Sequence, residues 1–431
     1  MGERCPSLHF PKTNLGRSFV RTPGVRSDVV STQVFTEIVS LSWGKHSHGP
    51  PHIAPERAKK TSPMPSIEYS AVKPADATGL VSLLTDAFHG STVKFWRNWF
   101  SLIWDENPAF SQNHPRGVLA GHEGKIVGFL AWFPVMLQFR GEEVLSSNGG
   151  GLAVHRDFRR RGIATKLREQ HLDVSGDTFT FATTAGPITL GINKKLGFRL
   201  LPSNVHSRYH FYSVFILDPR EWMKLRYISH LSGALPVCSR SICFLLDRYQ
   251  SLRTATVWSR CSQETDLIVK ELGEADASFD HLWGETKHYY TITNVRTSRV
   301  INWYLNPKNH SKKRLYACYK DKKLLGYMIF IEREVRGIKT LFCGDVWYKR
   351  DEFCVLEELL RFTIGQARNM ECGAVVLPNY TKELSGHFTR LGLARIRDDR
   401  RNEFYKAPDW MERLINADNS YFVYFQGDRA K

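Results

Sequence analysis

The stretch Gly-Gly-Gly-Leu-Ala-Val-His-Arg-Asp-Phe-Arg-Arg-Arg-Gly-Ile-Ala-Thr-Lys-Leu-Arg, residues 149–168, decides how the chain is read. Residues 152–154 form a short apolar run of the kind that ends a strand. A basic segment follows at 159–162, and from Ile163 onward apolar residues recur at helical spacing. The stretch therefore predicts a strand, a tight basic turn and a helix, in that order.

A turn of this kind suits an anion. The first N–H groups of a helix have no partner within the helix, and its dipole favours negative charge there by roughly 0.3–1 kcal/mol at an exposed site. Gly162 has no Cβ, so a phosphate oxygen can approach the backbone closely. The arginines at 159–161 and the Thr165 hydroxyl add donors. An anion-binding loop and a solvated basic turn that starts an ordinary helix both fit these residues.

The sequence downstream favours the anion-binding loop. Residues 179–198 are typical of a strand, a Gly-Pro break and a short helix that ends at Lys-Leu-Gly197-Phe, where glycine is favoured as a C-terminal cap. The order Arg159-x-x-Gly162-x-Ala164 after a strand, followed by this second unit, resembles the core of the GNAT acyltransferase superfamily. The resemblance covers residues 67 to about 215.

The resemblance implies acetyl-CoA as co-substrate and no metal. In that family the loop holds the pyrophosphate of acyl-CoA, and a backbone N–H beside the fourth strand polarises the acyl carbonyl. The cofactor-binding residues implied in this chain are Leu152, Ala153, Val154, Arg159, Arg160, Arg161, Gly162, Ile163, Ala164, Thr165 and Asn193.

The resemblance also implies direct attack of an amine on the thioester in a ternary complex. Many family members protonate the leaving thiolate from a tyrosine, but Asn193 occupies that position here and supplies only a hydrogen bond. Tyr209 or Tyr212, on the next predicted strand, is a substitute acid, and His155 is a candidate base because its pKa is ordinarily near neutral. Packing roles fit these side chains as well. The catalytic candidates are His155, Tyr209 and Asn193.

The second half of the chain repeats this order of elements. A hairpin at 314–331, a strand at 340–347, a helix from 355 and a strand at 374–377 precede Arg-Leu-Gly392-Leu. These elements resemble a second GNAT domain. The segment 346–356 lacks the Arg/Gln-x-x-Gly-x-Gly/Ala pattern, so we expect this half to be degenerate and to bind no coenzyme A there.

The expected fold is α+β (mixed α/β), with two tandem GNAT-type domains, each a mostly antiparallel central sheet flanked by helices. A strand at 209–217 is expected to close the first domain. The tail is rich in Ser, Pro, Arg and His without periodicity, which is typical of disorder; a transit peptide and a natural start at Met64 are alternatives. The predicted ranges are 1–63 for a disordered tail, 64–217 for the catalytic domain, 218–262 for a helical connector and 263–431 for the degenerate domain.

Composition limits the other classes of function. Hydrophobic residues make up 42% of the chain and no apolar run approaches membrane-spanning length, so we expect a globular cytoplasmic protein. The net charge of +17 favours an anionic ligand, yet no nucleic-acid motif accompanies it and we expect no nucleic-acid partner. The eight cysteines are scattered, which argues against a structural zinc site.

The expected function is acyl-CoA-dependent N-acetylation of an amine acceptor by the first domain. A small molecule, an amino sugar or a peptide fits as acceptor, because the fold does not fix the acceptor. The alternative is a non-catalytic acyl-CoA-binding or scaffold protein with a retired active site, which Asn193 and the degenerate second half would suit.

Overall fold

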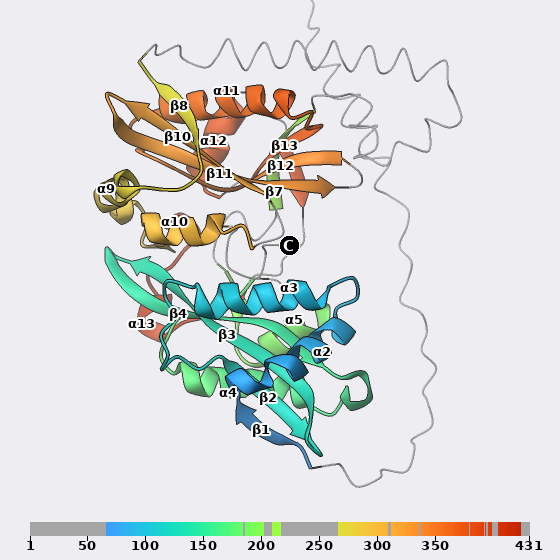
Figure 1. Cartoon of the computed structure of the whole chain (residues 1–431). Helices are drawn as coiled ribbons and strands as arrows, with labels where there is room; N and C mark the ends of the chain where they lie inside the picture. The colour runs from blue at the N-terminus through green and yellow to red at the C-terminus, as the bar shows by residue number, and fades with distance from the viewer. Residues whose placement is uncertain are drawn as a thin grey trace, which may run out of the picture. The chain divides into compact units, whose positions relative to one another are not determined.

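The structure is a computed structural model that describes residues 66–183, 186–201, 209–216, 266–308, 312–335, 338–378, 380–391, 393, 395–398 and 404–423 (Figure 1). The predicted tail and the predicted connector lie outside the described residues. Among the described helices, none is long and apolar enough to cross a membrane.

One sheet, sheet A, is built mainly from strands of the first half of the chain. Its strand order is β1-β2-β3-β4-β5-β15-β6, and β4 and β5 are parallel whereas the other neighbours in this order are antiparallel. Two further strands extend it, since β9 pairs with β3 and β16 with β9. The strands are β1 (Glu68–Ala71), β2 (Gly117–His122), β3 (Lys125–Phe139), β4 (Glu142–Val154), β5 (Thr180–Ala182), β6 (Arg199–Leu200), β9 (Ile292–Asn294), β15 (Phe404–Lys406) and β16 (Ser420–Tyr421).

Side chains of β3 alternate between the two faces of sheet A. Helices of this half cover both faces. Phe129 and Phe133 point to the face covered by α2 and α3, whereas Leu130 and Trp132 pack with Ile163 of α4 on the other. Trp96, Trp99 and Phe100 of α3 are buried in this core, which is the packing role that aromatic spacing favours. The helical segments are η1 (Pro74–Asp76), α2 (Ala77–Ala87), α3 (Val93–Phe100), η2 (Ser101–Asp105), η3 (Arg156–Phe158), α4 (Ile163–Ser175) and α5 (Pro187–Lys195).

The second half builds sheet B, in the order β8-β10-β11-β12-β13-β7-β14. The long helix α11 packs on β8 and β10–β13 (Figure 1). The strands are β8 (Ile268–Leu272), β10 (Lys313–Lys320), β11 (Lys323–Val335), β12 (Ile338–Tyr348), β13 (Ala374–Pro378), β7 (Tyr209–Ile216) and β14 (Arg395–Asp398). The helical segments are α9 (Ala277–Thr286), η4 (Lys287–Tyr289), α10 (Ser298–Leu305), α11 (Phe353–Asn369), α12 (Lys382–Arg390) and α13 (Asp409–Glu412).

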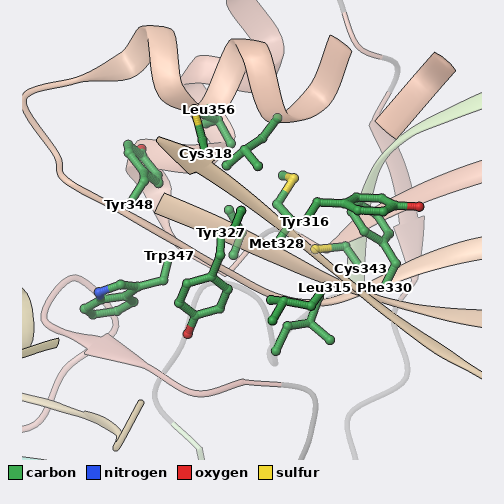
Figure 2. Close-up of a cluster of buried hydrophobic side chains, with 14 of the residues drawn as sticks. Leu315, Tyr316, Cys318, Tyr327, Met328, Phe330, Cys343, Trp347, Tyr348 and Leu356 are labelled. Atoms are coloured by element: carbon green, nitrogen blue, oxygen red, sulfur yellow. The ribbon is translucent and has the colours of Figure 1, made fainter. Parts of the chain in front are cut away.

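The core of the second half uses both faces of sheet B. Figure 2 shows Leu356 of α11 beside Cys318 of β10 on one face, while Tyr327 and Trp347 point to the other. All four side chains are at most 2% exposed. Long strands whose residues are apolar on both faces are typical of a sheet that is covered on both sides. The hairpin, the strands and the helices predicted for this half are therefore present.

The strand predicted to close the first domain lies elsewhere. Strand β7 pairs with β13 and β14 in sheet B, and the place between β5 and β6 in sheet A is taken by β15. The expectation that 209–217 closes the first sheet is therefore wrong. Periodicity identifies a strand but not its neighbour, and alternating apolar residues of this kind fit either sheet. The two sheets thus share one strand order and exchange one strand.

Further contacts join the two halves. Strand β9 continues sheet A by pairing with β3, where Leu137 faces Asn294. The indole N–H of Trp303 donates to the carbonyl of Leu102 over 2.8 Å, and Glu106 accepts hydrogen bonds from Asn306 and Lys308. Strand pairing and hydrogen bonds thus join the described parts of the two halves.

Candidate functional site

The end of β4 departs from regular sheet geometry. Its pairing with β3 shifts by one residue around Gly151, because Phe129 faces Ala153 whereas Ala131 faces Gly150. This bulge places Gly151 at φ +63°, a conformation that glycine adopts at little cost. Pairing with β5 ends at Asn148, although β4 runs on to Val154. Beyond Asn148, β4 has no further pairing with β5, and the predicted cofactor residues 152–154 lie on this unpaired part of β4.

The predicted basic loop joins this strand end to a helix. Helix α4 begins at Ile163, and its N-cap Gly162 has φ +78° and no capping side chain. The first intrahelical bond runs from the N–H of Lys166 to the carbonyl of Gly162 over 3.0 Å. The N–H groups of Ile163, Ala164 and Thr165 therefore precede the helix's own hydrogen-bond pattern. A Cβ on Gly162 would meet nothing within 4 Å, so the space above the loop is open.

The three arginines of the loop are exposed and partly engaged with the loop itself. Arg159 Nε donates to the carbonyl of Val154 at 3.1 Å, and Arg161 Nη2 donates to the carbonyl of Asp157 at 3.0 Å. Arg160 adopts φ +63°. Each guanidinium has five N–H donors, so these bonds leave donors for a phosphate. The loop therefore presents backbone N–H groups and guanidinium donors at the start of α4.

Of the three catalytic candidates, two lie in the first half. His155 follows β4; its Nδ1 accepts a hydrogen bond from the N–H of Asp157 at 3.4 Å and lies 3.7 Å from the Asp157 carboxylate. Asn193 on α5 is fully buried, and neither polar atom of its amide has a hydrogen-bond partner within the described part of the chain. Tyr209 lies on β7, in sheet B, and its side chain is outside the described residues.

A buried polar cluster between β4 and α4 was missed by the sequence reading. Arg168 Nη1 lies 2.7 Å from His171 Nδ1, and His171 Nε2 lies 2.7 Å from the Ser147 hydroxyl. The imidazole stacks on Trp132 with a centroid separation of 5.2 Å. Burial first, then the charges of Arg168 and His114, holds the pKa of His171 well below its usual value. In the sequence, the helical spacing of His171 with Ile163 and Leu167 indicates that it lies on the buried face of the helix.

Sheet B has the same bulge in the strand that matches β4. On β12, Asp345 faces Ile329 whereas Cys343 faces Phe330, so Gly344 is the extra residue. Pairing with β13 ends at Phe342. This edge is occupied by the protein's own side chains.

Tyrosines fill the edge of β12. Tyr380 donates to the carbonyl of Gly344 at 2.7 Å, and Tyr421 donates to the carbonyl of Val346 at 2.7 Å. Asp345 is fully buried and pairs with the fully buried Arg296 at 3.0 Å. Tyr327 and Tyr421 also donate to the Asp345 carboxylate, at 2.9 and 3.0 Å, so this buried ion pair is a satisfied structural group. The edge of β12 therefore offers little room for a ligand.

Metal ligands do not gather in the described part of the chain. No group of three or more His, Cys, Asp or Glu side chains is placed there to hold a metal ion. The described cysteines are free thiols: Cys318, Cys343, Cys354 and Cys372.

Comparison with known proteins places part of the first half in a family. A family model described as an acetyltransferase (GNAT) domain matches residues 68–200. The fold is similar to that of a GCN5-related N-acetyltransferase from Anabaena variabilis ATCC 29413, with 12% identity and a TM-score of 0.50 over 80% of this chain and 74% of that one. It is also similar to a probable N-acyltransferase from Enterococcus faecalis V583, with 11% identity and a TM-score of 0.52 over 80% and 73%. No curated protein matches the sequence.

At these identities the two structures support the fold alone, and the family rests on the matched domain. That domain spans β1 to β6 and so contains the bulged strand, the basic loop and α5. Residues 68–200 of this chain are a GNAT acetyltransferase domain.

Proposed function

We propose that residues 68–200, completed by β15, bind acetyl-CoA and transfer its acetyl group to an amine. The observation that carries the proposal is the unpaired end of β4, beyond Asn148, which leads through the basic loop to the uncapped N-terminus of α4. The loop residues 159–165 would bind the pyrophosphate, because backbone N–H groups, a helix dipole and guanidinium donors converge there. Backbone N–H groups of residues 152–154 are candidates to polarise the acyl carbonyl.

The acceptor amine has to be neutral to attack, so a base or a water chain must take its proton. We assign the base to His155, since it lies between the bulged strand and the loop. Asn193 would hold the coenzyme by a hydrogen bond from its amide, which is buried with no partner in the described residues. Tyr209 stays a candidate acid only if it reaches the site from β7 in sheet B.

We further propose that the second half is a GNAT-type domain that has lost its own coenzyme site. It has the strand order of sheet A and the same bulge. Its strand edge is filled by Tyr380 and Tyr421, and its β12–α11 turn lacks the basic glycine pattern. Such a half would shape the acceptor site or mediate assembly.

Calorimetric titration of acetyl-CoA into the full chain tests the loop. The double variant Arg159→Ala, Gly162→Asp is expected to lose binding, because it removes a cation and places a carboxylate where the phosphate would lie. Gly124→Asp is the matched control: Gly124 has φ +74°, nothing lies within 4 Å of its Cβ position, and it belongs to the β2–β3 turn. Equal affinity for the double variant and the wild type would contradict the assignment of the loop.

The second measurement separates an enzyme from a coenzyme-binding scaffold. Release of free thiol from acetyl-CoA is followed with a panel of small amines, amino sugars and peptides. Turnover with any of them, lost in the loop variant, supports the transferase. Tight binding without turnover across the panel favours the scaffold protein.

A further inference from the structure

A guanidinium is buried beside β4, just beyond the last pair between β4 and β5. Arg168 on α4 is 1% exposed, and no carboxylate pairs with it within the described part of the chain. Burial lowers the pKa of Arg168 to about 9. Keeping a cation out of water without a partner costs several kcal/mol. Packing alone does not account for an arginine at this position.

Neighbouring groups hold the guanidinium in one orientation. Its Cζ lies 4.5 Å from the centre of the Phe198 ring, and Nη1 lies 2.7 Å from His171 Nδ1. A guanidinium only donates hydrogen bonds, so His171 Nδ1 is the acceptor. The proton of the neutral imidazole is then on Nε2, which donates to the Ser147 hydroxyl at 2.7 Å. The Arg168–His171–Ser147 chain thus fixes the guanidinium through one nitrogen.

The opposite edge of the guanidinium is unused. Neither Nε nor Nη2 of Arg168 has a hydrogen-bond partner among the described residues. These two nitrogens form a planar fork that matches the two oxygens of a carboxylate. A single positive charge is also balanced by a single carboxylate, whereas a phosphate would leave negative charge uncompensated. The free edge therefore has the geometry and the charge for a carboxylate.

The guanidinium also lies at the inner end of the candidate site. A Cβ on Gly149 would lie 2.0 Å from Arg168 Nη1, so the guanidinium touches β4 directly after its last pair with β5, Asn148 with Phe181. The loop lies beyond Val154, at the other end of this unpaired segment. Val154 lies five residue steps along the strand from Gly149, which corresponds to about 16 Å. A ligand anchored at the loop and running back along β4 approaches Arg168 with its reactive end.

We propose that Arg168 binds a substrate carboxylate through its Nε and Nη2 edge. This inference rests on the proposed function, because it places the carboxylate near the thioester end of a bound acyl-CoA. Two sources present the same chemistry: the terminal carboxylate of a dicarboxylic acyl group, and the α-carboxylate of an amino-acid acceptor. No chemistry at Arg168 itself is involved, and its role is recognition.

The first arm of the test titrates length-matched acyl-CoA pairs into the full chain. Succinyl-CoA is compared with butyryl-CoA, and glutaryl-CoA with valeryl-CoA. If the carboxylate is on the acyl group, the charged member binds roughly tenfold to hundredfold more tightly, as expected for hydrogen bonds to a charged group. The second arm titrates amino acids and their amides into protein saturated with coenzyme A. A preference for the free acids assigns the carboxylate to the acceptor.

Arg168→Met keeps the length of the side chain and removes the planar fork. In either arm, the ratio of affinities for the charged and uncharged ligands should therefore fall to about one. Arg168→Lys keeps the charge but not the planar fork, so it should retain part of the preference for the carboxylate. Arg199→Met is the control for charge, because Arg199 follows Phe198 in the same half, has a 69% exposed side chain, and pairs with Glu412. It should keep the full preference.

Thermal unfolding distinguishes recognition from a structural role. Arg168→Met should unfold close to the temperature of the wild type without ligand, since the removal of a buried cation without a counter-ion offsets the loss of its hydrogen bond to His171. A large loss of stability, or no carboxylate preference in either arm while acetyl-CoA still binds, overturns the inference and leaves the proposed function standing. Failure of the wild type to bind any acyl-CoA overturns both.

Discussion

At the scale of single residues, the first half contains buried polar groups whose protonation is fixed by their neighbours. His171 is fully buried between Arg168 and Ser147, and no titratable acid shares the cluster in the part of the chain that the structure describes. The imidazole must be neutral, since a proton on Nδ1 would face the guanidinium. A histidine that is neutral in the folded state and free to ionise in the unfolded state links stability to pH.

The pH dependence of unfolding should therefore carry the signature of His171. Its pKa is lowered by folding, so below about pH 6.5 the unfolded chain binds a proton that the folded protein does not. Stability falls as pH drops, by about 1.4 kcal/mol between pH 7.5 and 5.5 from this group. His171→Gln, whose amide can keep both hydrogen bonds, should lose that part of the dependence in urea unfolding. Parallel profiles for the two proteins would show that His171 titrates normally.

At the scale of elements, the bulge in β4 connects the sheet to the site. It shifts the strand by one residue at Gly151, next to the point where β5 ends its pairing. The indole of Trp99 lies against Gly151, because a Cβ there would come within 3.0 Å of its Cη2 atom. The α3 helix thus supports the bulge from one face of the sheet, while α4 supports the same strand from the other.

Gly151→Ala should weaken acetyl-CoA binding. The substitution forces an L-residue into φ +63°, at a cost of roughly 1–2 kcal/mol, and pushes the new methyl group toward Trp99. Gly124→Ala is the matched control, since Gly124 has φ +74° and open space around it. Calorimetry should show an affinity loss for Gly151→Ala alone, although urea unfolding shows a similar backbone cost in both. Unchanged affinity in Gly151→Ala would remove the bulge from the binding site.

Local signals in the sequence were sufficient for most elements but not for all of their partners. The basic turn and Gly197 predict α4 and α5 correctly, because caps and glycine conformations depend on neighbouring residues. The position of β7 in sheet B depends on contacts far along the chain, which periodicity does not encode. The burial of Arg168 was not predicted either. A charged residue on a helix is ordinarily solvated, and only the packing around it shows otherwise.

At the scale of the whole molecule, each half lacks one strand that the other supplies. The first half contains β7 in its sequence but needs β15, and the second contains β15 but needs β7. Tyr405 of β15 is buried among Phe179 and other first-half residues, with a ring separation of 5.4 Å to Phe179. The boundary between the halves in sequence is therefore not a boundary between independent cores.

Fragments should show this dependence directly. Residues 64–262 produced alone should fail to give a stable, acetyl-CoA-binding domain, because the edge of β5 and the apolar surface under Tyr405 are left uncovered. Co-production with residues 263–431 should restore a complex that purifies together and binds like the intact chain. A stable fragment 64–262 with full affinity would indicate that sheet A closes without β15.

The exchange of strands also determines when sheet A can be completed during synthesis on the ribosome. Domains ordinarily fold as their last residue emerges, at synthesis rates of about 5–20 residues per second. Here sheet A waits for residues 404–406, and β7 emerges before any strand of sheet B that it joins. The nascent first half therefore remains an open sheet, with β5 exposed, for on the order of ten seconds or more. During that interval the unpaired edge of β5 is available to pair with other chains. Chaperone protection would therefore matter most between the synthesis of β6 and that of β15.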